Sequence, residues 1–295
     1  MMDLLIQRVV DGLGNGCIYA ALALALVLVF RSTGVVNFAQ GELAMLSTYL
    51  VWILVDAGAG IWLALAAAVV VSFAAGAVLE RGLIRLVPPD NHLVMIIVMI
   101  GLYTMLDALG LIVFGANPRQ LPSLFSGGNA TFGGVTVPYA TVGALVLLAV
   151  ISAGLWLLFG RTKLGLGLRA VAENTESSRL AGLPVSRLLA CGWGLSAALG
   201  AVAGVLVTSL GLFLQPSMML PVLVYAMASA TLGGFDSPVG AVLAGLLLGV
   251  AGSLVTGYVG FIGPDLALAV PVVVMLVVMF ARPEGLLGSR KVVRA

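Results

Sequence analysis

Residues 12–30 read GLGNGCIYAALALALVLVF, an apolar run without a charged side chain that ends at Arg31. A helix that crosses the hydrocarbon core of a bilayer needs about 20 mostly apolar residues, so this run predicts a membrane-spanning helix. Further stretches have the same character, at 61–79, 93–115, 139–160, 188–214, 237–263 and 266–281. Two shorter or interrupted stretches, 41–55 and 216–235, bring the prediction to about eight or nine transmembrane segments.

The composition supports the same fold class. Of the 295 residues, 61% are hydrophobic and only 9% are charged, whereas soluble domains carry about 25% charged residues. The mean hydropathy of +1.19 and the 38 glycines suit helices that pack closely in lipid, because small residues let backbones approach. We therefore expect an all-α, polytopic membrane helix bundle with some segments short or broken, forming a single transmembrane domain over residues 1–295.

The distribution of basic residues predicts the orientation, because Lys and Arg accumulate in cytoplasmic loops. If the N-terminus is outside and nine segments cross, only Arg8 and Arg119 of the 14 basic residues lie outside. Segment 161–187 and the C-terminus are then cytoplasmic. Segment 116–138 becomes an external loop, in which the turn residues predict a small hairpin over 131–137.

Segment 161–187 reads RTKLGLGLRAVAENTESSRLAGLPVSR and is the most polar part of the chain. Its pattern predicts one short amphipathic helix over 168–180, ended by Gly182 and Pro184. The apolar side of this helix would be formed by Leu168, Val171, Ala172 and Leu180. Two interpretations remain open, a docking element for a soluble partner and a peripheral helix that only covers the bundle.

The sequence lacks the motifs of several enzyme classes. A phosphate-binding loop ends in Gly-Lys followed by Ser or Thr, but Lys163 and Lys291 are followed by Leu and Val. A lone His92 and two distant cysteines, Cys17 and Cys191, supply neither a metal site nor a catalytic pair. We therefore expect a chain that is not an enzyme, hydrolyses no ATP by itself, and binds no cofactor, metal or nucleic acid.

Polar residues interrupt the apolar region 12–56, which is too long for one crossing. The break includes Asn37, Gln40, Gly41 and Glu42. Polar breaks at membrane depth expose backbone groups to a cavity where solutes can bind, and an intramembrane charge is a functional candidate. An ordinary cytoplasmic turn with Glu42 in the first turn of the next helix remains an equal alternative.

A second break follows at 232–240, where LGGFDSPVG contains Gly233, Gly234 and Asp236. The sequence Asp236-Ser-Pro is a good helix start, because proline is favoured in the first turn. Three Gly-x-x-x-Gly pairs predict close helix crossings, although such spacing also arises by chance in a glycine-rich chain. These pairs begin at Gly12, Gly200 and Gly245.

Four blocks along the chain together resemble the LivH-type permease subunit of ABC importers for branched-chain amino acids. The blocks are GCIYA at 16–20 continuing through GVVNFAQGE at 34–42 to Met45 and Tyr49, GLGLRAVAEN at 165–174 with Ala181-Gly182, LGG at 232–234 with Gly240, Gly245 and Gly249, and RPEGLLG at 282–288. The resemblance covers almost the whole chain. It departs at Gln40, where the family usually has histidine.

The resemblance implies a multi-pass subunit of a bacterial-type cytoplasmic membrane that works by alternating access. Its partners would be a second, LivM-type permease, two cytoplasmic ATPase subunits that hydrolyse the ATP, and an extracytoplasmic substrate-binding protein. The segment from 168 to 182 would be the coupling helix, with contacts from Arg169, Ala170, Glu173, Asn174 and Gly182. Candidate residues of the substrate pathway are Asn37, Gln40, Gly41, Glu42, Gly233, Gly234 and Asp236.

Three alternative functions remain. A permease of the same family could carry another small solute, such as urea, a short amide or a sugar, and the departure at Gln40 keeps this open. An ion-coupled secondary transporter would work without ATPases. An intramembrane enzyme is disfavoured because the chain offers no plausible catalytic pair.

Overall fold

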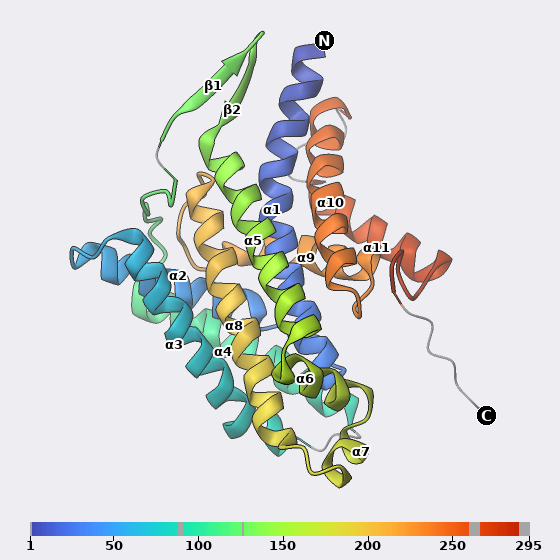
Figure 1. The fold of residues 1–295 in the computed structure, drawn as a ribbon. Coiled ribbons are helices and arrows are strands. Elements are labelled where there is room, and N and C mark those ends of the chain that lie inside the picture. Colours follow the sequence, from blue (N-terminus) through green and yellow to red (C-terminus); the bar gives the residue numbers. More distant parts are fainter. Residues whose placement is uncertain (1, 88–90, 126, 260–265, 289–295) are drawn as a thin grey trace.

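A computed structural model of the chain describes residues 2–87, 91–125, 127–259 and 266–288 (Figure 1). The helices are α1 (Met2–Thr33), α2 (Gln40–Asp56), α3 (Ile61–Gly82), α4 (His92–Phe114), α5 (Tyr139–Arg161), α6 (Lys163–Glu173), α7 (Thr175–Leu180), α8 (Val185–Ser209), α9 (Met219–Gly233), α10 (Pro238–Tyr258) and α11 (Ala269–Ala281). A 3₁₀ turn, η1 (Ile84–Leu86), follows α3, and the strands are β1 (Asn129–Phe132) and β2 (Val135–Pro138). The predicted all-α class is confirmed.

The stretches predicted to cross the membrane are helical over most of their lengths. In the described part of the chain, six helices are long and apolar enough to span a bilayer: α1, α3, α4, α5, α8 and α10. Helices α2, α9 and α11 have only 17, 15 and 13 residues, so the expected short segments are present. The stretch predicted at 188–214 is helical only to Ser209, because Gly211 adopts a left-handed φ of 101°. The end of the stretch predicted at 237–263 lies outside the described residues.

Helix α1 is long enough to project from the membrane. Its 32 residues extend about 48 Å, whereas the hydrocarbon core is about 30 Å thick. The first turns carry Asp3, Arg8 and Asp11 and lie at the end of the bundle where β1 and β2 are found (Figure 1). We call this the hairpin end. The opposite end, which carries α6 and α7, is called the α6–α7 end.

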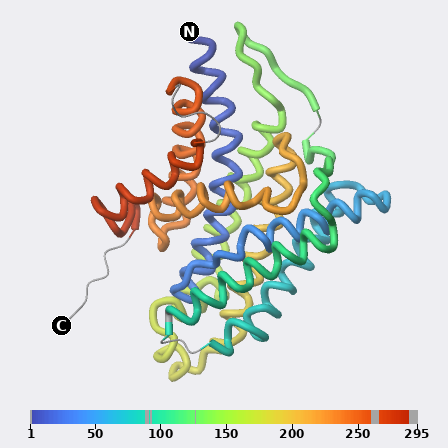
Figure 2. The backbone as a smooth tube through the Cα atoms, turned by 180° about the vertical axis from the view of Figure 1, so that it is seen from behind, coloured from blue at the N-terminus to red at the C-terminus, as the bar shows by residue number. Residues whose placement is uncertain are grey.

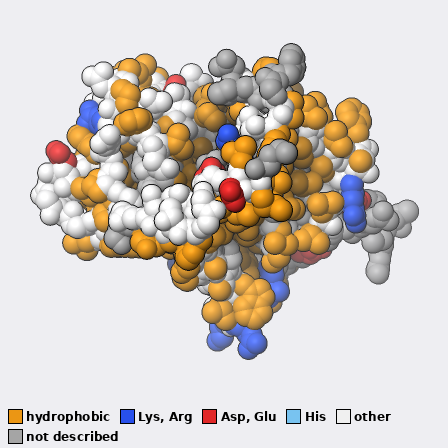
Figure 3. Space-filling model, turned by 90° about the horizontal axis from the view of Figure 1, so that it is seen from above, with side chains coloured by type: hydrophobic (Ala, Val, Ile, Leu, Met, Phe, Trp, Pro, Cys, Tyr) orange, Lys and Arg blue, Asp and Glu red, His pale blue; other side chains and the backbone are white. Residues whose placement is uncertain are grey.

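Helices α1 and α8 form the interior of the bundle, as the tube in Figure 2 shows. In the most apolar window of each helix, 78% of α1 and 72% of α8 is buried, against 11% of α5. The outer helices expose large apolar side chains, for example 68% of Val70, 81% of Ile112 and 89% of Phe280. The apolar surface of these outer helices suits contact with lipid. In the view from above in Figure 3, hydrophobic side chains are interspersed with polar groups and exposed backbone.

Glycines allow α1 and α10 to approach closely. A Cβ atom added at Gly16 would lie 2.8 Å from the Cα of Leu246, and one at Gly12 would lie 2.6 Å from the Cα of Val250. Real Cβ atoms do not approach so closely, so larger residues would push the helices apart. On α8, a Cβ atom at Gly204 would lie 2.6 Å from the carbonyl oxygen of Ala44 in α2. The close crossings predicted from the three glycine pairs are confirmed.

The hairpin predicted within the loop 116–138 is present and slightly longer than expected. Strands β1 and β2 pair antiparallel from Asn129 opposite Pro138 to Phe132 opposite Val135. Gln7 of α1 ties the hairpin to the bundle, because its Nε2 donates to the Thr136 carbonyl at 3.1 Å and its Oε1 accepts from the Thr136 amide at 2.8 Å. The hairpin is therefore held against the projecting end of α1.

Candidate functional site

The break between α1 and α2 is organised by the Asn37 side chain. Its Oδ1 accepts a hydrogen bond from the Ala39 amide at 3.0 Å, and its Nδ2 donates to Gln40 Oε1 at 3.0 Å. Such local side-chain bonds replace the helical ladder where it stops. Asn37 and Gln40 are both buried, with exposures of 1% and 0%.

Gln40 lies inside the bundle and not at a surface turn. Its Nε2 donates to the Ser196 carbonyl in α8 at 3.0 Å, and the Ser196 hydroxyl bonds both Gln40 Oε1 at 3.0 Å and the Ala25 carbonyl of α1 at 2.7 Å. Ala25 lies about 12 Å along α1 from its end at Thr33. The chain thus turns back into the bundle before α2 begins, which favours a break at membrane depth over an ordinary turn.

Ser196 was not among the residues singled out from the sequence. It sits in the small-residue run of α8, 156 positions from Gln40, and nothing in its local pattern distinguishes it from other serines. The pairing with Gln40 depends on the crossing of α2 and α8. Only the three-dimensional arrangement reveals it.

Three consecutive residues at the start of α2 contact three different elements. Gln40 bonds α8, as described above. A Cβ atom at Gly41 would lie 3.3 Å from the Cβ of Met219, so Gly41 lets α9 approach. Glu42 lies within electrostatic range of Asp107 in α4. The first turn of α2 is therefore a junction between α4, α8 and α9.

Glu42 is the most unusual group at this junction. Its side chain is fully buried, and neither carboxylate oxygen has a hydrogen-bond partner among the described residues. A buried polar group without a partner costs free energy, and a buried charge costs more. Asp107, an acidic residue that acts on it electrostatically, is half-buried. Among the described residues, no hydrogen bond therefore offsets the free-energy cost of burying the Glu42 carboxyl group.

The second predicted break is present between α9 and α10. Helix α9 ends at Gly233, Gly234 has a left-handed φ of 100°, and Ser237 caps α10 by accepting from the Gly240 amide at 3.1 Å. Pro238 occupies the first turn, as predicted. Gly233 and Gly240 contact each other so closely that neither position has room for a side chain.

The C-terminal block resembling the family packs on this second break. The Leu286 amide donates to the Leu232 carbonyl at 2.8 Å, and the Leu287 amide donates to the Gly233 carbonyl at 3.2 Å. These bonds satisfy carbonyls that the end of α9 leaves free. Added Cβ atoms at Gly285 would lie 2.7 Å from the Cα of Gly234. Two of the four blocks, far apart in the sequence, therefore form one structural unit.

This unit adjoins the last turns of α1. The rings of Phe235 and Phe30 have centroids 4.8 Å apart. Asp236 acts electrostatically on Arg31 of α1. The two breaks thus both contact α1, one through Ser196 at Ala25 and the other through Phe235 at Phe30.

The segment 161–187 differs from its prediction. It contains two helices, α6 and α7, instead of one helix over 168–180. Asn174 divides them, because its Oδ1 caps α7 by accepting from the Ser177 amide at 2.8 Å. Leu168 and Val171 are buried as predicted, but Ala172 is exposed. Leu180 is 87% exposed, because the chain breaks at Asn174 and Leu180 belongs to a separate helix.

The proposed contact residues of this segment face outward for the most part. Arg169, Glu173, Asn174 and Gly182 are exposed, and Ala170 is half-buried. Gly182 ends α7 with a left-handed φ of 78°, and its amide donates to the Arg179 carbonyl at 3.0 Å. On the opposite side, Leu168 packs on Gly192 of α8, with its Cδ2 atom 3.7 Å from a Cβ added there.

No group of three or more His, Cys, Asp or Glu side chains within the described ranges could hold a metal ion. The polar residues of the two breaks are amides, hydroxyls and the carboxyl groups of Glu42 and Asp236. Amide and carboxyl groups of this kind can donate to or accept from a polar solute.

Comparison with known proteins places this arrangement in a family. A sequence profile described as "Branched-chain amino acid transport system / permease component" matches residues 8–279. The high-affinity branched-chain amino acid transport system permease protein BraD of Pseudomonas aeruginosa is 30% identical over 97% of both chains. The corresponding LivH protein of Escherichia coli is 30% identical over 97% of this chain and 96% of its own. A probable LivH protein of Methanocaldococcus jannaschii is 29% identical over 90% of this chain and 87% of its own. The chain therefore belongs to the family of branched-chain amino acid transport system permease components.

Proposed function

We propose that this chain is the permease subunit of an ABC importer that carries branched-chain amino acids across a bacterial-type cytoplasmic membrane. The observation that carries the proposal is the re-entrant start of α2, which brings Gln40 and Glu42 into the interior of an apolar bundle. Family membership supports the substrate class. The whole chain acts as one transmembrane domain, with residues 116–138 outside and with 161–187 and the C-terminus in the cytoplasm.

The three polar residues at the first break have different roles in this proposal. Asn37 and Gln40 bond each other and Ser196, so they hold the break in shape. Glu42 has no hydrogen-bond partner among the described residues, so it is the candidate for a transient contact with the ammonium group of the substrate. Gly41, Gly233 and Gly234 allow the close approach of α9 and the turn into α10, and Asp236 positions that turn beside Arg31.

Transport requires partners that supply energy and substrate. The partners are a LivM-type permease, two cytoplasmic ATPase subunits and an extracytoplasmic binding protein. ATP is hydrolysed in the ATPases, and this chain contributes no cofactor or catalytic site. The exposed residues Arg169, Glu173, Asn174 and Gly182, with Ala170 behind them, form the contact with an ATPase.

A continuous set of contacts links that surface to the first break. Helix α6 packs on α8 through Leu168 and Gly192, and α8 holds α2 through Ser196 and Gln40. Movement of α6 by the ATPases would shift α8 and change the packing at the start of α2. In alternating access, the transporter exchanges between an inward-facing and an outward-facing state. The substrate and the ATPases shift this equilibrium only if each binds the two states with unequal affinity.

Reconstitution tests this function. The chain is assembled in proteoliposomes with its permease partner, ATPases and binding protein, and uptake of labelled leucine, isoleucine and valine is measured with and without ATP. We expect ATP-dependent uptake that requires the binding protein. Uptake by the isolated chain driven by an ion gradient would instead indicate a secondary transporter, and uptake of urea but not of leucine would indicate a different solute.

A further inference from the structure

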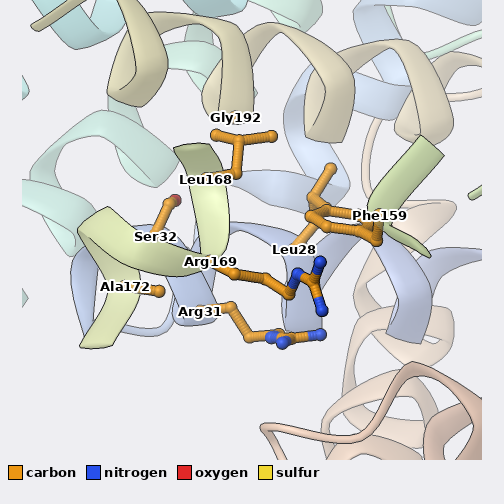
Figure 4. Close-up of a pocket in the computed structure, with 8 residues that line it drawn as sticks. All are labelled: Leu28, Arg31, Ser32, Phe159, Leu168, Arg169, Ala172 and Gly192. Atoms are coloured by element: carbon orange, nitrogen blue, oxygen red, sulfur yellow. The ribbon is translucent and has the colours of Figure 1, made fainter. Parts of the chain in front are cut away.

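A small hollow opens between four helices at the α6–α7 end. It lies between the last turns of α1 and α5, the middle of α6 and the start of α8 (Figure 4). Its enclosed part has a volume of about 10 Å³, room for about one water molecule, and the hollow widens toward the outside. Leu28, Phe159 and Leu168 supply apolar walls, and Arg31 and Arg169 supply its charge.

The two arginines place like charges beside one another. In Figure 4, the guanidinium groups of Arg31 and Arg169 extend from different helices toward the same side of the hollow, and their charges interact. Arg31 is half-buried and lies over the Phe159 ring, with its Cζ atom 5.6 Å from the centroid. Asp236 is the acidic group that acts electrostatically on Arg31. An anion between the guanidinium groups would relieve their repulsion, and guanidinium binds phosphate oxygens well.

The position of the hollow indicates the source of that anion. Arg31 and Arg161 mark the ends of the apolar parts of α1 and α5, so the hollow lies at the level of lipid headgroups. Beside it, α5 presents Trp156 and Leu157, which are 61% and 51% exposed. These side chains can lie along acyl chains, whereas a free phosphate ion would gain nothing from them. Basic pockets between transmembrane helices are suited to lipid headgroups.

We propose that the mouth of this hollow binds the phosphate headgroup of an anionic phospholipid, held by Arg31 and Arg169, with its acyl chains against α5. Arg169 belongs to α6, the helix that we assign to contact with the ATPase. The bound lipid would therefore connect the end of α1 with that helix. The binding itself does not depend on the transport function, so it can be tested on the isolated chain.

The full-length chain is placed in nanodiscs of phosphatidylcholine containing phosphatidylglycerol, and retained lipid is measured by native mass spectrometry. We expect selective retention of phosphatidylglycerol. Each basic side chain near an anionic headgroup strengthens lipid binding about fivefold. The double variant Arg31→Gln with Arg169→Gln should therefore weaken retention by about thirtyfold. The matched control, Arg179→Gln with Arg187→Gln, removes two exposed basic groups of the same segment away from the hollow and should retain the lipid.

Two results would overturn the proposal. One is wild-type retention of phosphatidylglycerol by the variant lacking Arg31 and Arg169. The other is equal displacement of the lipid by inorganic phosphate at the same concentration, which would indicate a site for small anions. If the double variant does not fold, Arg169→Gln alone remains informative, because Arg169 is exposed and its loss should weaken retention by about fivefold.

Discussion

Replacing Gln40 with leucine tests whether the first break is held by its hydrogen bonds. Gln40 makes three side-chain bonds, with Asn37, with the Ser196 hydroxyl and with the Ser196 carbonyl. Leucine has a similar size but makes none of them. After Gln40→Leu, the Ser196 hydroxyl keeps its bond to Ala25, whereas the buried Asn37 amide loses its acceptor.

The cost can be worked out from these bonds. Side-chain hydrogen bonds between membrane helices average about 0.6 kcal/mol each, so the three lost bonds account for about 2 kcal/mol. The unpaired Asn37 amide adds about 1–3 kcal/mol, because a buried donor without a partner keeps its full desolvation cost. We expect Gln40→Leu to lower the free energy of unfolding by about 3–5 kcal/mol in total.

Gln40→His serves as the matched control. Imidazole has one acceptor nitrogen and one donor nitrogen, so it can accept from Asn37 and donate to the Ser196 carbonyl. We expect it to cost less than about 1 kcal/mol, because only one of the three bonds is lost. Gln40→Leu combined with Ser196→Ala should cost less than the sum of the two single changes, since the residues share bonds.

Unfolding is followed by denaturant titration in detergent micelles with a thiol-reactive dye, because Cys17 is buried and Cys191 is half-buried in the folded chain. A change of less than about 0.5 kcal/mol for Gln40→Leu, or equal losses for leucine and histidine, would refute the reasoning. The break would then be held by the packing of α2 against α8 and α9, and not by the amide of Gln40.

The other predictions concern the helix crossing, the buried acid and the ATPase contact. Gly249→Val should destabilise the chain by at least about 3 kcal/mol or prevent its accumulation, because a side chain there meets the α1 backbone; Gly154→Val on α5, where no described atom lies within 4 Å, should leave the unfolding midpoint unchanged. Glu42→Gln should unfold no more easily than wild type, because the carboxylate has no hydrogen-bond partner among the described residues to lose, while leucine uptake falls at least about tenfold if Glu42 contacts the ammonium group; unchanged uptake would remove it from the pathway. The Glu173→Trp and Gly182→Trp variants should enter the membrane normally, but ATP hydrolysis should be uncoupled from uptake in the assembled transporter. Normal uptake with normal co-purification of the ATPases would contradict the proposed contact between this segment and an ATPase.

Some of the candidate site was visible in local sequence because local chemistry decides it. Gly, Pro and Asn residues that stop a helix act within a few residues of themselves. The breaks at 34–39 and 234–237 and the cap by Ser237 were predictable for this reason. The division of 161–187 at Asn174 could have been foreseen from the same rule, because asparagine is a preferred N-cap and Glu176 follows in the first turn.

The sequence by itself determined that the chain is a polytopic helix bundle, where its two polar breaks fall, and which family it resembles. Hydrophobic run length and helix-stopping residues act locally, so they can be read without the fold. The tertiary structure alone decided that Gln40 bonds Ser196, that Glu42 is left without a partner among the described residues, and that 282–288 packs on the turn after α9. These contacts join residues far apart in the chain, and they depend on how closely glycines let α1, α2, α8 and α10 approach.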